Sequence, residues 1–176
     1  MIENLKKNFA LYLLKKKYLK RIDNETNKKD FIKNSNSFLV IMPENDEDYR
    51  HGYEIAKYLK IHKKKVSLVL PDFKYSLVDK HLNFELITYG LKSRNSLNMP
   101  GKALIEKLDN KKFDVVIDLS RMENIFSTGL SLLPETNIRV GLNKEKTNNF
   151  FNVRFNLWEN NSEISYRNLL NSLSMF

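Results

Sequence analysis

The stretch Phe113-Asp114-Val115-Val116-Ile117-Asp118-Leu119-Ser120 decides the fold class. Three consecutive apolar residues stand between two aspartates, which is typical of a strand that is buried on both faces of a parallel sheet. Working outward, the chain holds four comparable runs and one weaker run. The strong runs cover residues 37–42, 65–70, 84–89 and 138–142, and the weaker one covers 153–156.

Segments with helical spacing separate these runs, at residues 49–61, 101–108, 122–133 and 165–173. Strands that alternate with helices and lack a polar face indicate an α/β protein with parallel strands. We therefore expect one Rossmann-like three-layer domain over residues 37–176. Its sheet should be mostly parallel, with about five or six strands.

Residues 1–36 differ in texture and are expected to form a basic helix and a polar linker. Leu5, Phe9 and Leu13, together with Leu11, Leu14, Tyr18 and Ile22, recur at spacings of three and four, which predicts a helix over residues 2–22. Two interpretations stay open for its apolar face. The helix packs on its own domain or on a second subunit, or it lies in a membrane interface. Residues 23–36 read as a linker or mobile loop.

The charge is concentrated at the same end of the chain. The 176 residues carry 30 Lys and Arg against 21 Asp and Glu, a net charge of +9, and residues 1–36 account for +6 of it. An acidic lipid surface is therefore a possible partner for residues 1–22. Nucleic acid is a weaker candidate because no RNA-binding motif accompanies the charge.

Several chemistries are absent from the sequence. The chain has no cysteine, which excludes disulfides, thiolate metal sites and a cysteine nucleophile. Its five glycines are scattered and form neither a dinucleotide fingerprint nor a P-loop, so we expect no cofactor. The three histidines show no metal-ligand spacing, so we expect no metal. No stretch approaches the roughly 18 apolar residues that span a bilayer. We expect a cytoplasmic protein, and the alternative localisation is peripheral attachment to the inner face of the membrane.

Polar side chains follow three of the expected strands, at the edge where parallel sheets bind ligands. A carboxylate there could act as a general base, and Arg121 and Lys144 could hold a phosphate or a sugar acid. The competing interpretation is structural, with Asp48 and Ser120 as helix N-caps and acidic residues complementing a helix N-terminus. The candidates are Asp48 as base, and Asn45, Asp46, Arg50, His51, Ser120, Arg121, Asn143 and Lys144 as binding residues.

The run at 113–120, the helix after it and Ile138-Arg139-Val140-Gly141-Leu142 together resemble the N-terminal half of the family 9 glycosyltransferases, the heptosyltransferases of lipopolysaccharide inner-core assembly. Leu39-Val40-Ile41 and the helix at 55–60 match the family's first strand and helix without a gap, and the segment 168–173 is similar to the helix that ends the half-domain. The resemblance covers roughly residues 38–173. In this register Asp48 falls on the aspartate of the family's Gly-Asp pair, the proposed general base.

The sequence also departs from that family. Glu47 stands where the family has glycine, and Glu54 where it often has proline. The second half of the two-domain GT-B architecture, which supplies most of the nucleotide-sugar site, has no counterpart here. The resemblance thus implies a glycosyltransferase-like binding or partner-dependent module that is not catalytically competent alone. Asp48 would act as the base only if a protein partner completes the site, and a homodimer is the other association that we consider. The alternative is a non-enzymatic protein that uses its basic helix on a membrane surface or on RNA.

Overall fold

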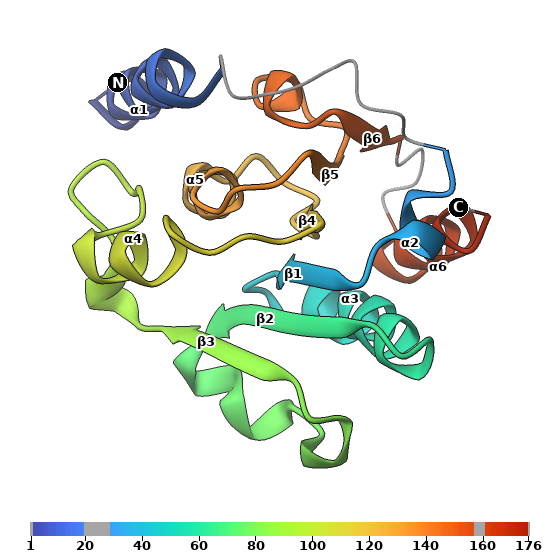
Figure 1. Cartoon of the computed structure of the whole chain (residues 1–176). Coiled ribbons are helices and arrows are strands. Elements are labelled where there is room, and N and C mark those ends of the chain that lie inside the picture. Colours follow the sequence, from blue (N-terminus) through green and yellow to red (C-terminus); the bar gives the residue numbers. More distant parts are fainter. Residues whose placement is uncertain (1, 20–28, 157–160, 176) are drawn as a thin grey trace.

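The computed structural model describes residues 2–19, 29–156 and 161–175. Its six strands form one sheet in the order β3-β2-β1-β4-β5-β6, and every neighbouring pair is parallel (Figure 1). This confirms the predicted Rossmann-like α/β domain, including its weak sixth strand. The strands are β1 (Ser37–Ile41), β2 (Lys65–Pro71), β3 (Glu85–Tyr89), β4 (Val115–Asp118), β5 (Ile138–Leu142) and β6 (Val153–Phe155).

Helices cover both faces of this sheet (Figure 1). One face carries α1 (Ile2–Tyr18), α4 (Lys102–Leu108) and α5 (Ile125–Leu132), and the other carries α2 (Phe31–Asn34), α3 (Asp46–Ile61) and α6 (Ser162–Leu173). Short 3-10 helices lie in the connections between these elements, and one of them falls within residues 91–100, which were expected to form a loop. They are η2 (Asp72–Leu77), η3 (Lys80–Leu82), η4 (Leu91–Ser93) and η5 (Asn148–Phe150).

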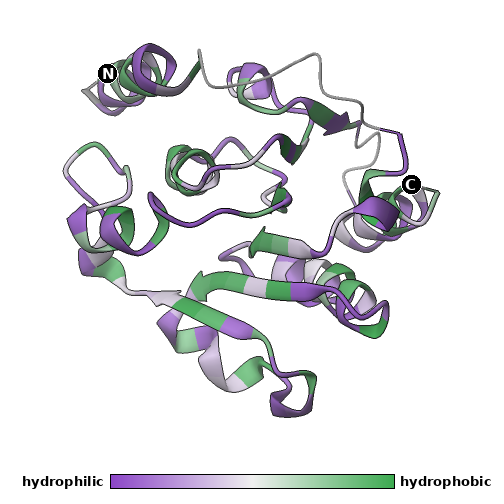
Figure 2. Cartoon of the chain, in the orientation of Figure 1, coloured by the Kyte–Doolittle hydropathy of each residue, from purple (hydrophilic) through white to green (hydrophobic). Residues whose placement is uncertain are grey.

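The central strands are mostly apolar because each face of the sheet has its own core. Phe38 and Val40 of β1 belong to the cluster under α3 and α6, whereas Leu39 and Ile41 belong to the cluster under α5. In the register, Val40 lies opposite Leu68 of β2 and Ile117 of β4. In Figure 2 the neighbouring strands β1 and β2 are both coloured mostly as hydrophobic.

Asparagine caps three of the helices. The side-chain oxygens of Asn45, Asn124 and Asn161 accept backbone N–H bonds at the starts of α3, α5 and α6. The predicted caps at Asp48 and Ser120 are therefore wrong. Helix α3 begins three residues earlier than expected because Asn45 accepts from the N–H of Asp48 at 2.8 Å, which leaves the Asp48 side chain for other contacts.

The segment expected to be a linker contains a short helix instead. Phe31 and Ile32 are both buried in the core under α2 and α3, and this apolar pair holds α2 against the domain. Of the predicted helix over residues 2–22, the structure confirms α1 as far as Tyr18. Residues 20–22, and the part of the linker up to residue 28, lie outside the described residues.

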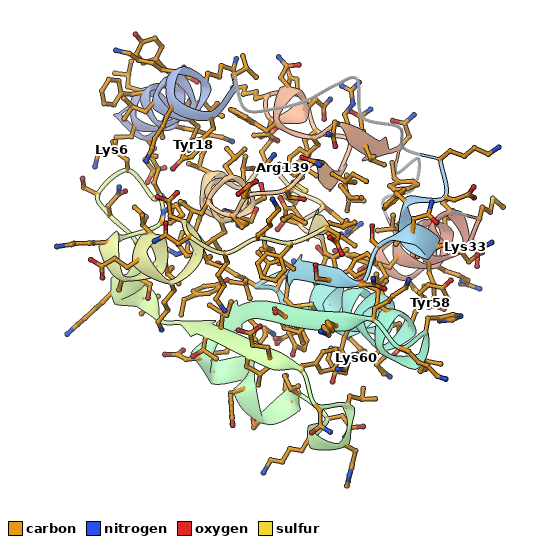
Figure 3. The ribbon with its side chains drawn as sticks, viewed as in Figure 1. Lys6, Tyr18, Lys33, Tyr58, Lys60 and Arg139 are labelled. Atoms are coloured by element: carbon orange, nitrogen blue, oxygen red, sulfur yellow. The ribbon has the colours of Figure 1, made fainter. Side chains whose placement is uncertain are left out.

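Helix α1 packs on α5, and α5 is in turn held to the sheet by hydrogen bonds. Ala10, Leu11, Leu14 and Tyr18 are buried and share the core cluster of α5, and Figure 3 shows Tyr18 on the side of α1 toward α5. Beneath α5, Arg139 of β5 is buried and donates to the carbonyl oxygens of Ser131, Pro134 and Thr136. The guanidinium thus ties the C-terminal end of α5 to the sheet, and α5 in turn supports α1.

Candidate functional site

The middle of the sheet is the place where this fold can bind a ligand. Strands β1 and β4 are neighbours, and the chain leaves β1 for α3 on one face and β4 for α5 on the other (Figure 1). Such a switch point opens a crevice outside the carboxyl ends of the strands. Here it forms a hollow of about 200 Å³, lined by residues 43–45, Asp48 and residues 120–124.

Asp48 lies at the wall of this hollow and is almost completely buried. Its Oδ1 accepts from Arg121 Nε at 2.6 Å and from Ser162 Oγ at 2.7 Å, and its Oδ2 accepts from Asn45 Nδ2 at 2.8 Å. The carboxylate therefore joins three segments, namely the start of α3, the loop after β4 and the start of α6. A general base needs an oxygen within reach of the substrate proton. Of the roughly four acceptor positions of the Asp48 carboxylate, three are occupied by groups of its own chain.

A second ion pair lies deeper in the same edge. Lys144 Nζ contacts Asp118 Oδ2 at 2.9 Å, and the two side chains are 1% and 0% exposed. Asp118 also accepts from the backbone N–H of Ser120 at 3.0 Å and from Ser127 Oγ at 3.2 Å. The cluster fixes the loop after β4 against the loop after β5. Lys144 is thereby engaged with a carboxylate of its own chain.

The remaining predicted site residues spread around the hollow. Asp46 turns away to pair with the buried amine of Lys74, whose hydrogen bond and charge hold the pKa of that carboxyl below its usual range. Asn143 donates to Asn156 Oδ1 at 2.6 Å. Arg50 is exposed and His51 half-buried, and neither lines the hollow. Thus Asn45, Asp48, Ser120 and Arg121 come together, and Lys144 joins Ser120 through Asp118.

The described residues gather no three His, Asp or Glu side chains in an arrangement that could hold a metal ion. Asp48 pairs with Arg121 and Asp118 pairs with Lys144, so both cations are engaged with carboxylates of their own chain. Glu123 also lines the hollow, and its Oε2 is buried without a hydrogen-bond partner in the part of the chain that the structure describes. A carboxylate in this position, beside cations that are already paired, does not favour the capture of a phosphate.

Helix α1 presents a different surface. Leu5, Phe9 and Tyr12 are 64%, 53% and 57% exposed, and Leu19 just beyond the helix is exposed as well. At 3.6 residues per turn these positions form one stripe along the side opposite the buried residues of the helix. The Phe9 and Tyr12 rings stack with their centroids 6.5 Å apart. Lys6 and Lys17 flank the stripe on one side, Lys15 flanks it on the other, and Lys16 lies within it. Among the described helices, none is long and apolar enough to cross a bilayer.

Comparison with known proteins gives one family. Residues 6–176 match the family described as "Family of unknown function (DUF6913)". The chain belongs to the DUF6913 family. No curated protein matches it. The family match includes most of α1 and the whole sheet, so the helix and the α/β domain belong to one family unit.

Sequence reasoning missed two features of this DUF6913 chain at the sheet edge. Ser162 reaches Asp48 across 114 positions of sequence, and nothing local to either residue signals that contact. The pairing of Asp118 with Lys144 did carry a signal. The strand register pairs Asp118 of β4 with Gly141 of β5. Lys144 follows Gly141 by three residues, so it lies in the loop just beyond the end of β5 that is next to Asp118.

Proposed function

We propose that the protein is a non-catalytic binding domain that attaches to anionic membrane surfaces through α1. One observation carries this proposal. The outward side of α1 holds an exposed apolar stripe between lysines, while the inward side is anchored to α5. A helix held in this way can press its stripe into the headgroup region and keep its lysines among acidic headgroups.

Both driving forces of peripheral binding are present on α1. Between residues 2 and 18 it carries five lysines and one glutamate, a net charge of +4. Each lysine near an anionic surface contributes roughly 1 kcal/mol, and each apolar side chain that becomes buried adds roughly 1.5–3 kcal/mol. Neither force has to order the helix, because α1 is already packed on the domain.

Two other partners, a second copy of the chain and nucleic acid, fit this stripe less well. A second copy would bring two helices of net charge +4 together, and like charges in contact oppose association. Nucleic acid would be attracted by the lysines. The exposed leucine and the two stacked rings of the stripe would not contribute to binding nucleic acid, except as a surface on which bases stack.

Vesicle sedimentation tests the proposal. We expect the protein to sediment with vesicles of phosphatidylglycerol and phosphatidylcholine and to stay in solution with pure phosphatidylcholine. The double variant Phe9→Ser, Tyr12→Ser should lower the partition coefficient at least about tenfold, because two interfacial side chains are lost. The matched control is Phe73→Ser, Tyr75→Ser, which removes two exposed rings from η2 beside the edge strand β3. It should bind like the parent.

Three outcomes would overturn the proposal. Equal binding of the Phe9, Tyr12 variant and the parent would show that the stripe does not contact lipid. A dimer in sedimentation equilibrium that dissociates in this variant would assign the stripe to a second copy. Binding to RNA, with no binding to anionic vesicles, would assign the lysines to nucleic acid.

A partner-dependent, glycosyltransferase-like module is the second candidate function. The observation in its favour is the position of Asp48, at the wall of a hollow at the topological switch point. Its test is native mass spectrometry of the protein purified from its own cells, with a nuclease-treated control. A co-purifying donor-domain polypeptide whose activity is lost in Asp48→Asn would support this candidate. Retained activity in that variant, with the fold intact, would exclude Asp48 as the base.

A further inference from the structure

An apolar groove of about 500 Å³ lies between α1, α4 and the C-terminal half of α5. Its walls are formed by Leu13 of α1, Met99 and Pro100 of the loop before α4, Ile105 of α4, Gly129 of α5, and Leu133 directly after α5. The groove lies on the flank of α1, next to the exposed stripe and separate from the switch-point hollow.

The shape of the groove depends on a close approach at Gly129. A Cβ atom at this position would meet Pro100 Cδ at 2.6 Å, which is closer than real Cβ atoms come. The missing side chain lets Pro100 approach α5 closely, and both Pro100 and Gly129 line the groove. Helix α1 packs on α5 and leaves open the space toward α4 that the groove occupies.

The mouth of the groove is basic. Lys16 and Lys17 contribute to its lining from α1, and none of its lining residues is acidic. Lys17 Nζ is held 4.9 Å from the centroid of the Tyr18 ring. Asn95 is the one described lining residue with a side-chain amide. A nucleotide base would need several hydrogen-bonding partners that these walls do not provide, whereas an alkyl chain needs none.

We propose that this groove binds one anionic single-chain amphiphile, a fatty acid or a molecule with one acyl chain and an acidic head. The alkyl chain lies against Leu13, Met99 and Ile105, and the acidic head pairs with Lys16 and Lys17. The volume falls in the range of small-molecule pockets, and the combination of apolar walls with a few charged groups is typical of them. This inference goes beyond attachment to a membrane and does not depend on it.

Displacement of a dansyl-labelled fatty acid from the 176-residue chain, at fatty acid concentrations below the micellar range, tests the proposal. Saturated fatty acids should compete with an affinity that rises about fourfold per added methylene until the groove is filled. Ile105→Trp should fill the groove and abolish binding. Its matched control, Ala103→Trp, adds the same ring at an exposed position of α4 and should bind like the parent.

The charge of the mouth is tested with a neutral ligand. The double variant Lys16→Gln, Lys17→Gln should weaken the fatty acid about tenfold and leave the fatty alcohol of equal length unchanged. Lys15→Gln, on the same turn and outside the groove, should have no effect on either ligand. Absence of saturable binding, binding by Ile105→Trp equal to the parent, or equal losses for acid and alcohol would each overturn the proposal. Because these ligands are free in solution, the fatty-acid measurement tests the groove independently of whether the protein sediments with vesicles.

Discussion

Replacing Asp118 with alanine is expected to lower the free energy of unfolding by about 3–5 kcal/mol. The substitution leaves the Lys144 ammonium buried without its carboxylate, and it removes the acceptor of Ser127 Oγ and of the Ser120 N–H. Removing one partner of a buried pair costs more than removing both, because the remaining charge is uncompensated. The double variant Asp118→Ala, Lys144→Met should therefore unfold at a higher urea concentration than Asp118→Ala alone.

Urea unfolding followed by circular dichroism measures both values. The control is Lys112→Met. It breaks an ion pair in which Lys112 Nζ lies 2.9 Å from Glu135 Oε1, and these two side chains are 76% and 71% exposed. Its loss should stay below about 1 kcal/mol, because exposed pairs contribute little. A loss below about 1 kcal/mol for Asp118→Ala would contradict the account of the sheet edge, as would a double variant less stable than the single one.

Asp48→Ala is expected to lower the free energy of unfolding by about 2–3 kcal/mol, since it removes the buried carboxylate to which Arg121 Nε and Ser162 Oγ donate. The effect should concentrate on α6. Tyr166 of α6 donates to the carbonyl oxygen of Leu119 at 2.5 Å, so α6 rests on the same loop that Arg121 orders. Amide hydrogen exchange should accelerate in α6 more than in the strands.

Two further variants separate a structural from a catalytic Asp48. Asp48→Asn keeps an acceptor for Arg121 and should lose less stability than Asp48→Ala. Ser162→Ala removes one hydrogen bond and should cost about 0.5–1.5 kcal/mol. Unchanged stability and unchanged exchange in Asp48→Ala would mean that the three contacts of this carboxylate do not hold the loops together.

The fold was predictable because its information is local. A run such as Val115-Val116-Ile117 is typical of a strand that is buried on both faces of a sheet. The helical segments between such runs indicate helical crossovers, which join parallel strands. The helix starts were less predictable. Asp48 and Asn45 are both good caps three residues apart, and the choice depends on whether the carboxylate is needed elsewhere, which only Arg121 and Ser162 decide.

The two surfaces proposed for binding depend on contacts between distant segments. The spacing of Leu5, Phe9, Leu11 and Leu14 predicts a helix with a broad apolar face, but it does not say which part of that face the domain covers. The structure buries Leu11 and Leu14 and leaves Leu5 and Phe9 exposed. The groove beside α1 needs Gly129 and Pro100 in contact, and no pattern in the sequence connects these two residues.

The central claim, that the outward stripe of α1 enters an anionic membrane, has a direct spectroscopic test. The chain has no cysteine, so a nitroxide can be placed at a single Phe9→Cys and, as the control, at a single Leu77→Cys on η2. On addition of phosphatidylglycerol vesicles, the Phe9 label should become more accessible to oxygen and less accessible to a water-soluble nickel complex, while the Leu77 label should not change. A Phe9 label whose accessibilities stay the same with and without vesicles would contradict the claim.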